Sequence, residues 1–318
     1  MADLVTFGEG LLRLSPPDEE RLEAARQFEV RTAGSAAGTA IAAERLGAVT
    51  TVMTKLPDGP IGRRVHNGLL EMGIDVEAVW GEEGRVGTYY IEHAGAPRGV
   101  NVVYDLEGSA FSTVSARRFD VDVVRNARGF FVTGISPALS DATREATANL
   151  LGAARKAGTT TALDFNYRSE LWSAAEARET LTQLFPAVDV LVVAARDAQR
   201  VLGHGGEEPA QIAHQIAADY EFTTVVVTRG ELGAIAWHDS VVHSHDGYET
   251  ETTDPVGAGD AFSGAFVARR LAGDDIREAL DYANAAAALK RTIPGDFAPI
   301  TRAEVEAVIA GENDDISR

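Results

Sequence analysis

The chain has 318 residues, 45% of them hydrophobic and none of them cysteine, which suits one large α/β domain and excludes disulfides and thiolate chemistry. Its 29 Lys and Arg against 48 Asp and Glu give a net charge of −19, which repels phosphodiester backbones and anionic lipid and argues against nucleic acid and membrane partners. No apolar stretch reaches the roughly 18 residues of a membrane span, and MADLVTFGEG lacks the basic and apolar regions of a signal peptide, so we expect a cytoplasmic protein.

The excess of acidic residues has two interpretations. One is functional, an attraction for cations or basic partners. The other is adaptation of the whole surface to high salt, as in halophilic proteins, where carboxylates keep a protein hydrated. The chain has only three lysines, Lys55, Lys156 and Lys290, beside 26 arginines, which favours salt adaptation.

The first hundred residues predict an α/β unit followed by a hairpin. Apolar runs, glycines and prolines indicate strands at 4–7, 11–14 and 50–54 and helices at 36–46 and 61–72. Two alternating runs, 87–92 and 100–105, flank the turn-rich Ala94-Gly95-Ala96-Pro97 and predict a β-hairpin. We expect a small sheet, a lid built from about 11–15 and 79–106, that is separate from the main sheet.

After Phe119 strands and helices alternate regularly. We predict strands at 129–133, 160–164, 188–193, 223–228 and 234–237, and helices at 141–157, 174–184, 195–202 and 209–220. Continuous β-branched runs such as 188–193 indicate a mostly parallel central sheet that is covered on both faces. Further helices follow at 258–272, 276–291 and 302–310. The chain therefore reads as one α/β domain over 1–318, with a flexible tail at 311–318.

The most informative segment is Asp254-Pro255-Val256-Gly257-Ala258-Gly259-Asp260, which leads into the helix at 258–272. Glycine amides can approach an anion closely, and a helix N-terminus carries a partial positive charge. Such a loop can stabilise a transferring phosphoryl group while Asp260 accepts a proton from the attacking hydroxyl. The plainer alternative is a capped helix in which Asp260 only balances the helix dipole.

The segment DPVGAGDAFSGAFV resembles the C-terminal signature of the ribokinase-like (PfkB) carbohydrate kinases, and the likeness extends over nearly the whole chain. The resemblance implies an α/β three-layer sandwich with a β lid, and an enzyme that uses ATP and Mg²⁺. It makes Asp260 the catalytic base and places Gly257, Ala258 and Gly259 in the anion hole. On the nucleotide side it implies contacts from Thr228, Gly230 and Asn284, together with Gly257 and Gly259.

The segment DFNYRSELW, 164–172, is similar to that of 2-keto-3-deoxygluconate kinases and, less closely, of fructokinases. The resemblance implies transfer of the γ-phosphate to the terminal hydroxyl of 2-keto-3-deoxygluconate, a sugar acid of Entner-Doudoroff-type catabolism. The alternatives are a fructokinase or another sugar kinase of the family, and a sugar or nucleotide sensor of the same fold without turnover. The expected substrate contacts are Gly34, Tyr89, Tyr104, Asn166, Arg168, Asp254 and Asp260.

Three positions depart from the family pattern or map onto it weakly. Gly38 stands where the N-terminal motif has a sugar-binding Asn, and Leu106 stands where an Arg holds the substrate carboxylate; Arg98 could replace that charge. Asp197 occupies the position of a metal-associated acid. Mg²⁺ is the expected ion, and the sequence leaves open whether a monovalent cation such as K⁺ is required. Pairing or packing of the lid strands between subunits predicts a homo-oligomer.

A nucleotide-dependent dehydrogenase is the alternative from another enzyme class, because Gly8-Glu9-Gly10 follows the first strand. Arg13 stands in place of the third glycine of that motif, and the next element is a strand rather than a helix. The dehydrogenase interpretation therefore fails, because its glycine motif requires a third glycine and a helix directly after the first strand.

Overall fold

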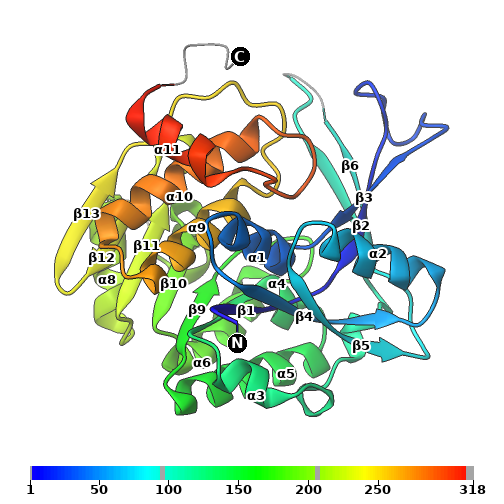
Figure 1. Cartoon of the computed structure of the whole chain (residues 1–318), viewed down its shortest axis with the longest axis horizontal. Helices are drawn as coiled ribbons and strands as arrows, with labels where there is room; N and C mark the ends of the chain where they lie inside the picture. The colour runs from blue at the N-terminus through cyan, green and yellow to red at the C-terminus, as the bar shows by residue number, and fades with distance from the viewer. Residues whose placement is uncertain (1, 94–96, 205–207, 313–318) are drawn as a thin grey trace.

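A nine-stranded sheet forms the centre of the computed structural model, which describes residues 2–93, 97–204 and 208–312 (Figure 1). The strand order is β13-β12-β11-β10-β9-β8-β1-β4-β5. Strand β12 pairs antiparallel with both β13 and β11, and all other neighbouring strands pair parallel. The strands are β1 (Leu4–Phe7), β4 (Thr50–Pro57), β5 (Asp75–Gly81), β8 (Gly129–Thr133), β9 (Thr160–Asp164), β10 (Val190–Ala194), β11 (Thr224–Thr228), β12 (Ala234–His238) and β13 (Val241–His245).

Helices cover both faces of this sheet, as the β-branched runs predict (Figure 1). Successive residues of β10 show why: Leu191 and Val193 pack into one buried cluster and Val192 packs into the other. One face carries α1 (Ser35–Arg45), α2 (Pro60–Leu70), α9 (Ala258–Ala272), α10 (Ile276–Arg291) and α11 (Arg302–Ala310). The other carries α3 (Val121–Arg125), α4 (Ile135–Ala138), α5 (Asp141–Ala157), α6 (Ala174–Leu184) and α8 (Pro209–Asp219). This is the three-layer α/β architecture that the sequence predicts. Within the described ranges, no helix is long and apolar enough to cross a membrane.

The small sheet differs from the expected lid in two places. It consists of β3 (Glu29–Ala33), β2 (Leu11–Ser15), β6 (Thr88–Glu92) and β7 (Asn101–Asp105), in that order. Strand β3 was not predicted, because EVRTA alternates only weakly and has little buried surface. Residues 79–81, which the prediction assigned to the lid, continue β5 and pair with Lys55, Leu56 and Pro57 in the large sheet.

The small sheet faces the body of the protein with an apolar surface. Leu11, Tyr89, Ile91 and Leu106 are buried in a cluster that also contacts Val256, just before the glycine loop. In Figure 1 this sheet projects at the upper right from the region of β1 and α1. It is therefore positioned to cover the segment that carries Asp260.

Most other predicted elements match the structure closely, and the exceptions are local. The strand expected at 188–193 is β10 at Val190–Ala194. The helix expected at 195–202 is a short α7 (Ala195–Asp197) followed by a π turn, η4 (Ala198–Leu202), which ends at a left-handed Gly203. Of the hairpin turn and the predicted tail, residues 94–96 and 313–318 lie outside the described residues.

Helices α1 and α9 approach each other so closely that only glycine fits at one point of contact. A Cβ atom at Gly264 would lie 2.2 Å from the carbonyl oxygen of Thr39 and 2.9 Å from the Ala42 side chain. Backbone carbonyls cannot move aside as flexible side chains do. This contact brings the first turns of α1 and α9 together, and with them Ser35 and Asp260.

Gly264→Ala is therefore expected to destabilise the protein by about 1–3 kcal/mol, because overpacking a rigid contact outweighs the roughly 1 kcal/mol by which Ala is the better helix former. Chemical denaturation in high salt measures the change. The matched control is Gly152→Ala in α5, where no atom lies within 4 Å of the added Cβ; it is expected to be neutral or stabilising. Equal stabilities of the two variants would contradict the close α1–α9 contact.

Candidate active site

Polar side chains gather where the carboxyl ends of the central strands meet the first turns of α1 and α9. Asp164 is the last residue of β9, and Asn166 follows it two residues later. Asn166 adopts a left-handed backbone conformation with a φ of 40°, which asparagine tolerates better than most side chains. Its amide N–H donates to the Asp164 carboxylate at 3.2 Å. Open α/β sheets bind their ligands at this edge.

Asp260 lies in the first turn of α9, at the centre of this group. The Ser35 hydroxyl donates to its Oδ1 at 2.5 Å, and the Asn166 side-chain amide lies 3.5 Å from the same oxygen. The Asn166 amide also donates to Ser35 Oγ at 2.9 Å. Three segments that are far apart in the sequence therefore fix the position of one carboxyl group.

Burial shifts the titration of the two central acids. It raises the pKa of Asp260 from 3.8 to about 7, against the opposing effects of the Ser35 hydrogen bond and the Arg168 charge. Burial and the neighbouring Asp260 raise the pKa of Asp164 to about 8, although Arg168 opposes this rise. A carboxyl group that titrates near neutral pH is suited to accept a proton from a hydroxyl.

The glycine loop before α9 presents backbone amides to an open space. Gly257 is the N-cap of α9, with a left-handed φ of 82°, and no side chain caps the helix. A Cβ atom at Gly257 would lie 1.9 Å from the Asp296 carbonyl oxygen, so the loop requires glycine there, whereas a Cβ at Gly259 would meet no atom within 4 Å. Since the first N–H groups of a helix lack intrahelical partners, the Gly259 amide fits an incoming anion. The Ala258 amide donates to the Pro255 carbonyl at 3.3 Å, so its place in the anion hole stays a prediction.

Arg168 is the cation beside these acids. Its burial alone would lower the pKa, but the Tyr104 hydroxyl and the Asp260 carboxylate outweigh that effect and raise it. Asp197, at the end of α7, is also buried, and burial raises its pKa while Arg196 and Arg168 oppose the rise. Tyr104, Arg168 and Asp197 thus lie around the same polar centre as Asp260.

A second charged group lies beneath the small sheet. Arg13 of β2 forms ion pairs with Asp254 at 2.8 Å and with Asp296 at 3.2 Å. The Tyr89 hydroxyl donates to Asp296 Oδ1 at 2.6 Å. Asp254 also accepts from the amides of Val256 at 3.0 Å and Gly295 at 2.9 Å. Both Asp254 oxygens are engaged within the chain, so its contact with substrate stays a prediction.

The residues expected to contact the nucleotide, Thr228, Gly230 and Asn284, lie on three different elements. Thr228 ends β11, and Gly230, with a φ of 64°, begins the short turn η5 (Gly230–Leu232). Asn284 is buried on α10, and its side-chain amide donates to the Leu280 carbonyl of the same helix at 2.8 Å. Among the described residues, no hydrogen bond joins Asn284 to Thr228 or Gly230. The role of Asn284 in nucleotide binding stays a prediction.

The positions that depart from the family pattern acquire a structural explanation. A Cβ atom at Gly38 would lie 3.2 Å from the Cβ of Asp260, so a larger residue there would press on the central acid. Leu106 is buried in the apolar cluster under the small sheet. Arg98 is exposed and donates to the Glu19 carbonyl, away from this cluster, so Arg168 is the cation next to the central acid. Gly34, with a φ of 145°, is the N-cap of α1 and makes room for the Glu9 carbonyl, 2.5 Å from an added Cβ.

No group of three or more His, Asp or Glu side chains is arranged to hold a metal ion by itself in the described part of the chain. Asp197 as a metal ligand therefore stays a prediction. A magnesium ion that binds with nucleotide takes most of its ligands from phosphate oxygens and water, with one or two carboxylates. The acids around Asp164 can supply that contribution.

Sequence reasoning overlooked four residues of this region. Ser35 directly precedes the helix predicted at 36–46, and its hydroxyl was not identified as a hydrogen-bond donor to the central acid. Asp296 follows the Pro294-Gly295 turn, and nothing local marks it. Lys290 and Glu9 are buried charged residues, which periodicity cannot identify. Burial raises the pKa of Glu9 to about 7.

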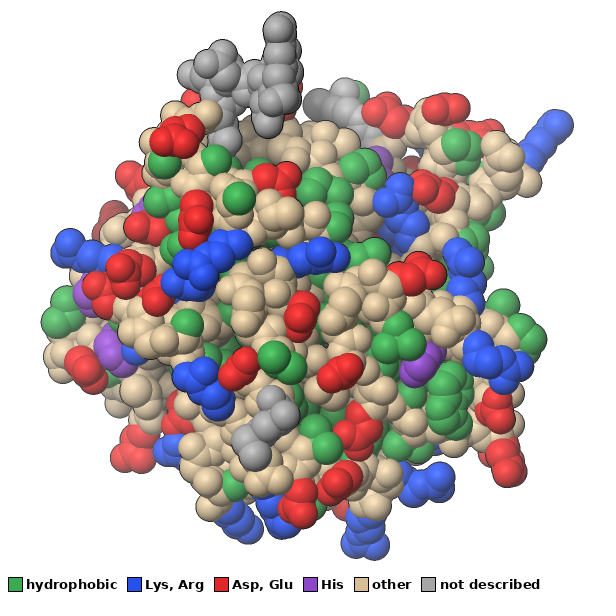
Figure 2. Space-filling view, in the orientation of Figure 1, with side chains coloured by type: hydrophobic (Ala, Val, Ile, Leu, Met, Phe, Trp, Pro, Cys, Tyr) green, Lys and Arg blue, Asp and Glu red, His purple; other side chains and the backbone are tan. Residues whose placement is uncertain are grey.

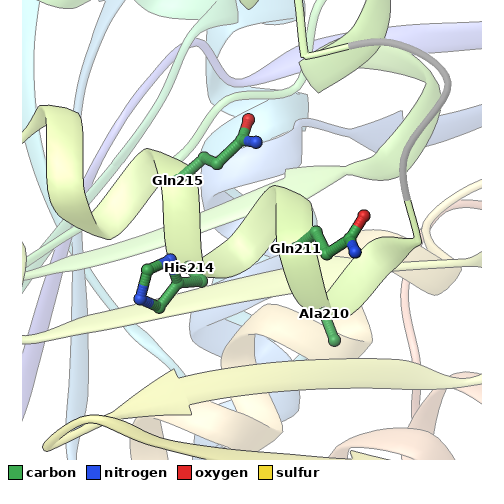
Figure 3. Close-up of a pocket in the computed structure, with 4 residues that line it drawn as sticks. All are labelled: Ala210, Gln211, His214 and Gln215. Atoms are coloured by element: carbon green, nitrogen blue, oxygen red, sulfur yellow. The ribbon is translucent and has the colours of Figure 1, made fainter.

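The face of the protein shown in Figure 2 carries a mixture of side-chain types. Figure 2 shows acidic and basic side chains interspersed over one face, with scattered apolar groups. A shallow hollow is lined by Ala210, Gln211, His214 and Gln215, all from the single helix α8 (Figure 3). It holds none of the predicted site residues.

Comparison with known proteins places this geometry in a family. The model of the pfkB family of carbohydrate kinases matches residues 1–302. The chain is 49% identical to a 2-dehydro-3-deoxygalactonokinase of Haloferax volcanii, over 100% of this chain and 99% of that one. It is 34% identical to a 2-dehydro-3-deoxygluconokinase of Thermoproteus tenax, over 93% and 90% of the two chains. The crystal structure of a 2-dehydro-3-deoxygluconokinase from Thermotoga maritima superposes with a TM-score of 0.92 at 34% identity, covering 97% of this chain and 98% of that one.

The raised pKa of the partly buried Asp260 carboxyl group predicts a pH-dependent change in stability on Asp260→Asn. The unfolded chain loses this proton near pH 4 and the folded chain only near pH 7, so folding loses free energy as the pH rises through this window. Asn removes the buried charge and retains the shape. We expect Asp260→Asn to be more stable than wild type at pH 8.5, by on the order of 1–3 kcal/mol, and to show no such gain at pH 4.5. Thermal denaturation in high salt, with exposed Glu249→Gln as control, measures this; equal gains for both variants at both pH values would contradict it.

Proposed function

The chain belongs to the pfkB family of carbohydrate kinases, and from this premise we propose that it transfers the γ-phosphate of ATP to the terminal hydroxyl of a 2-dehydro-3-deoxyhexonate. The observation that carries the proposal is the partly buried Asp260 carboxyl group at the N-terminus of α9, held by Ser35 and Asn166 beside Arg168. This arrangement combines a proton acceptor, an anion-binding loop and a cation in one place.

In the proposed reaction Asp260 accepts the proton of the substrate hydroxyl as that oxygen forms its bond to phosphorus. The bond between the γ-phosphorus and the bridging oxygen of the nucleotide breaks, and ADP leaves. The amides at Gly257–Gly259 stabilise the negative charge of the transferring group. ATP with Mg²⁺ supplies the phosphoryl group and neutralises part of its charge. The base needs a pKa near the working pH, and burial supplies that shift.

The acid-sugar preference is supported by Arg168. A guanidinium can form two parallel hydrogen bonds to a carboxylate, and Tyr104 lies close enough to share that ligand. Since Leu106 and Arg98 supply no cation there, we assign recognition of the substrate carboxylate to Arg168. The higher identity to the relative named 2-dehydro-3-deoxygalactonokinase, 49% against 34% for the relative named 2-dehydro-3-deoxygluconokinase, favours the galactonate epimer.

The test is a phosphorylation panel in high salt with ATP and Mg²⁺: both 2-dehydro-3-deoxyhexonates that are epimeric at C4, gluconate, fructose and ribose. We expect the two keto-deoxy acids to be phosphorylated with far higher kcat/KM than the neutral sugars, with the galactonate epimer first. Asp260→Asn is expected to lower kcat by about 10²–10⁴-fold. Turnover of fructose without the acids would overturn the substrate proposal, and full activity of Asp260→Asn would overturn the mechanism.

Ser35 gives a prediction about the pH profile. Its hydrogen bond favours the charged form of Asp260, so Ser35→Ala should raise the pKa of the base further. Because the base must be deprotonated, activity falls as the pH drops below this pKa. We expect the acid limb of kcat/KM to move to higher pH by about one unit, as follows from losing a charge-assisted hydrogen bond of about 1.5–3 kcal/mol that Asn166 and water partly replace. The control is exposed Ser169→Ala; an unchanged acid limb in Ser35→Ala would contradict the assignment.

A further inference from the structure

Lys290 is a buried cation that the proposed mechanism does not use. It lies in the last turn of α10, its side chain is 0% exposed, and it is one of only three lysines in the chain. Lysines are almost never fully buried unless they are paired. Burial lowers the pKa of Lys290 to about 8, while the nearby Asp254, Asp296 and Asp260 oppose that change. Lys290 is therefore largely charged at neutral pH although its burial is energetically unfavourable for an ammonium group.

Two main-chain carbonyl groups bind the ammonium. Lys290 Nζ donates to the Ile293 oxygen at 2.8 Å and to the Asp254 oxygen at 3.3 Å. Asp254 directly precedes the segment 255–259, which forms the glycine loop. Ile293 precedes Asp296, whose carbonyl oxygen lies against Gly257. The ammonium thus lies where the two backbone segments meet, behind the anion-binding loop.

Further hydrogen bonds join the same two segments. The amides of Thr253 and Asp254 donate to the Arg291 carbonyl at 2.8 and 2.9 Å. The Gly295 amide donates to Asp254 Oδ2 at 2.9 Å. These hydrogen bonds join the segment at 253–254 to the segment at 291–295, and Lys290 adds a further link between the two through the Asp254 and Ile293 carbonyls. Without the ammonium, the carbonyls of Asp254 and Ile293 would lose their common donor, and leaving a buried polar group unpaired is unfavourable.

The acidic side chains near Lys290 outnumber the basic ones, which favours a further positive charge there. Asp254 is buried and Asp296 is partly buried. Among the described residues Arg13 forms ion pairs with both acids, and His93 lies 3.7 Å from Asp254. The Tyr89 hydroxyl donates to Asp296, and Asp260 faces the group from α9. Backbone carbonyls that converge on a small cation are the ligand type used for K⁺. Here the ammonium of the chain fills that position.

We propose that Lys290 is a positioning residue whose ammonium acts as a built-in monovalent cation, holding the glycine loop in its anion-binding shape so that catalysis needs no added K⁺. The sequence alone left a K⁺ requirement open. The compact ammonium with three donors fits a junction of two carbonyls better than a planar guanidinium does, which accounts for lysine here in a chain with 26 arginines and only three lysines.

The first test uses the wild-type enzyme and its confirmed sugar, with KCl, NaCl or tetramethylammonium chloride at the same ionic strength. We expect kcat to agree within about two-fold in all three salts. Activation by K⁺ of ten-fold or more would show that the junction needs an external cation, and would overturn the proposal. This arm requires no variant, so poor folding of a mutant cannot obscure it.

The second test uses variants. Lys290→Met is expected to lower kcat 10- to 100-fold, with a smaller effect on the KM for sugar, while exposed Lys156→Met stays at the wild-type value. Lys290→Ala leaves a cation-sized space between the carbonyls, so in a tetramethylammonium background NH₄⁺ or K⁺ should restore kcat at least five-fold and raise the melting temperature. Wild-type kcat in Lys290→Met, or no response of Lys290→Ala to either cation in both readouts, would contradict the role.

The inference rests on the proposed anion-binding role of the glycine loop, and the two can fail separately. If no sugar acid is phosphorylated but another sugar is, the substrate proposal fails and the cation tests proceed with that sugar. If Asp260→Asn abolishes turnover while Lys290→Met does not change it, the kinase mechanism stands and the Lys290 role is wrong.

Discussion

The partial burial of the Asp260 carboxyl group is the constraint on which the arrangement of the site depends. A carboxylate out of water is costly unless it is hydrogen-bonded or paired, and the chain meets that requirement with groups from three distant segments. Ser35 donates from α1, Asn166 approaches from the turn after β9, and Arg168 supplies the charge. Two of these groups depend on a special backbone feature: Ser35 on the close α1–α9 contact at Gly264, and Asn166 on its own left-handed conformation. The remaining free-energy cost appears as a pKa near 7, which is what a general base requires.

Charge is organised in two connected groups around the glycine loop. Asp164, Asp197, Asp260 and Arg168 lie at the carboxyl ends of the strands and are proposed to handle the proton and the substrate carboxylate. Arg13, Asp254, Asp296 and Lys290 lie beneath the small sheet and are tied to the backbone on either side of the loop. The loop between them contains glycine where a Cβ atom would strike the Asp296 carbonyl. The second group is proposed to hold the glycine loop, and with it Asp260, in place.

The sequence predicted the large architecture because the relevant information is local. Buried β-branched runs, N-caps and glycine stops determined β8, β9, α5, α9 and α10 with their exact ends. Strand β3 and the extent of β5 were missed, because their residues are half-exposed and their pairing depends on partners far away in the chain. Among site residues, the DPVGAGD segment identified Asp260 through its spacing. Ser35, Asp296 and Lys290 could not be found in that way, because their importance lies in contacts across more than thirty residues.

The central claim is that the fold itself tunes the Asp260 carboxyl group to titrate near neutral pH. The most direct measurement is a titration of this group by ¹³C NMR in protein labelled at aspartate carboxyl carbons, without nucleotide or sugar, with Asp260→Asn used to assign the resonance. The account predicts a midpoint near pH 7 for the resonance that the substitution removes. A midpoint at or below about pH 4, the ordinary value for aspartate, would contradict it.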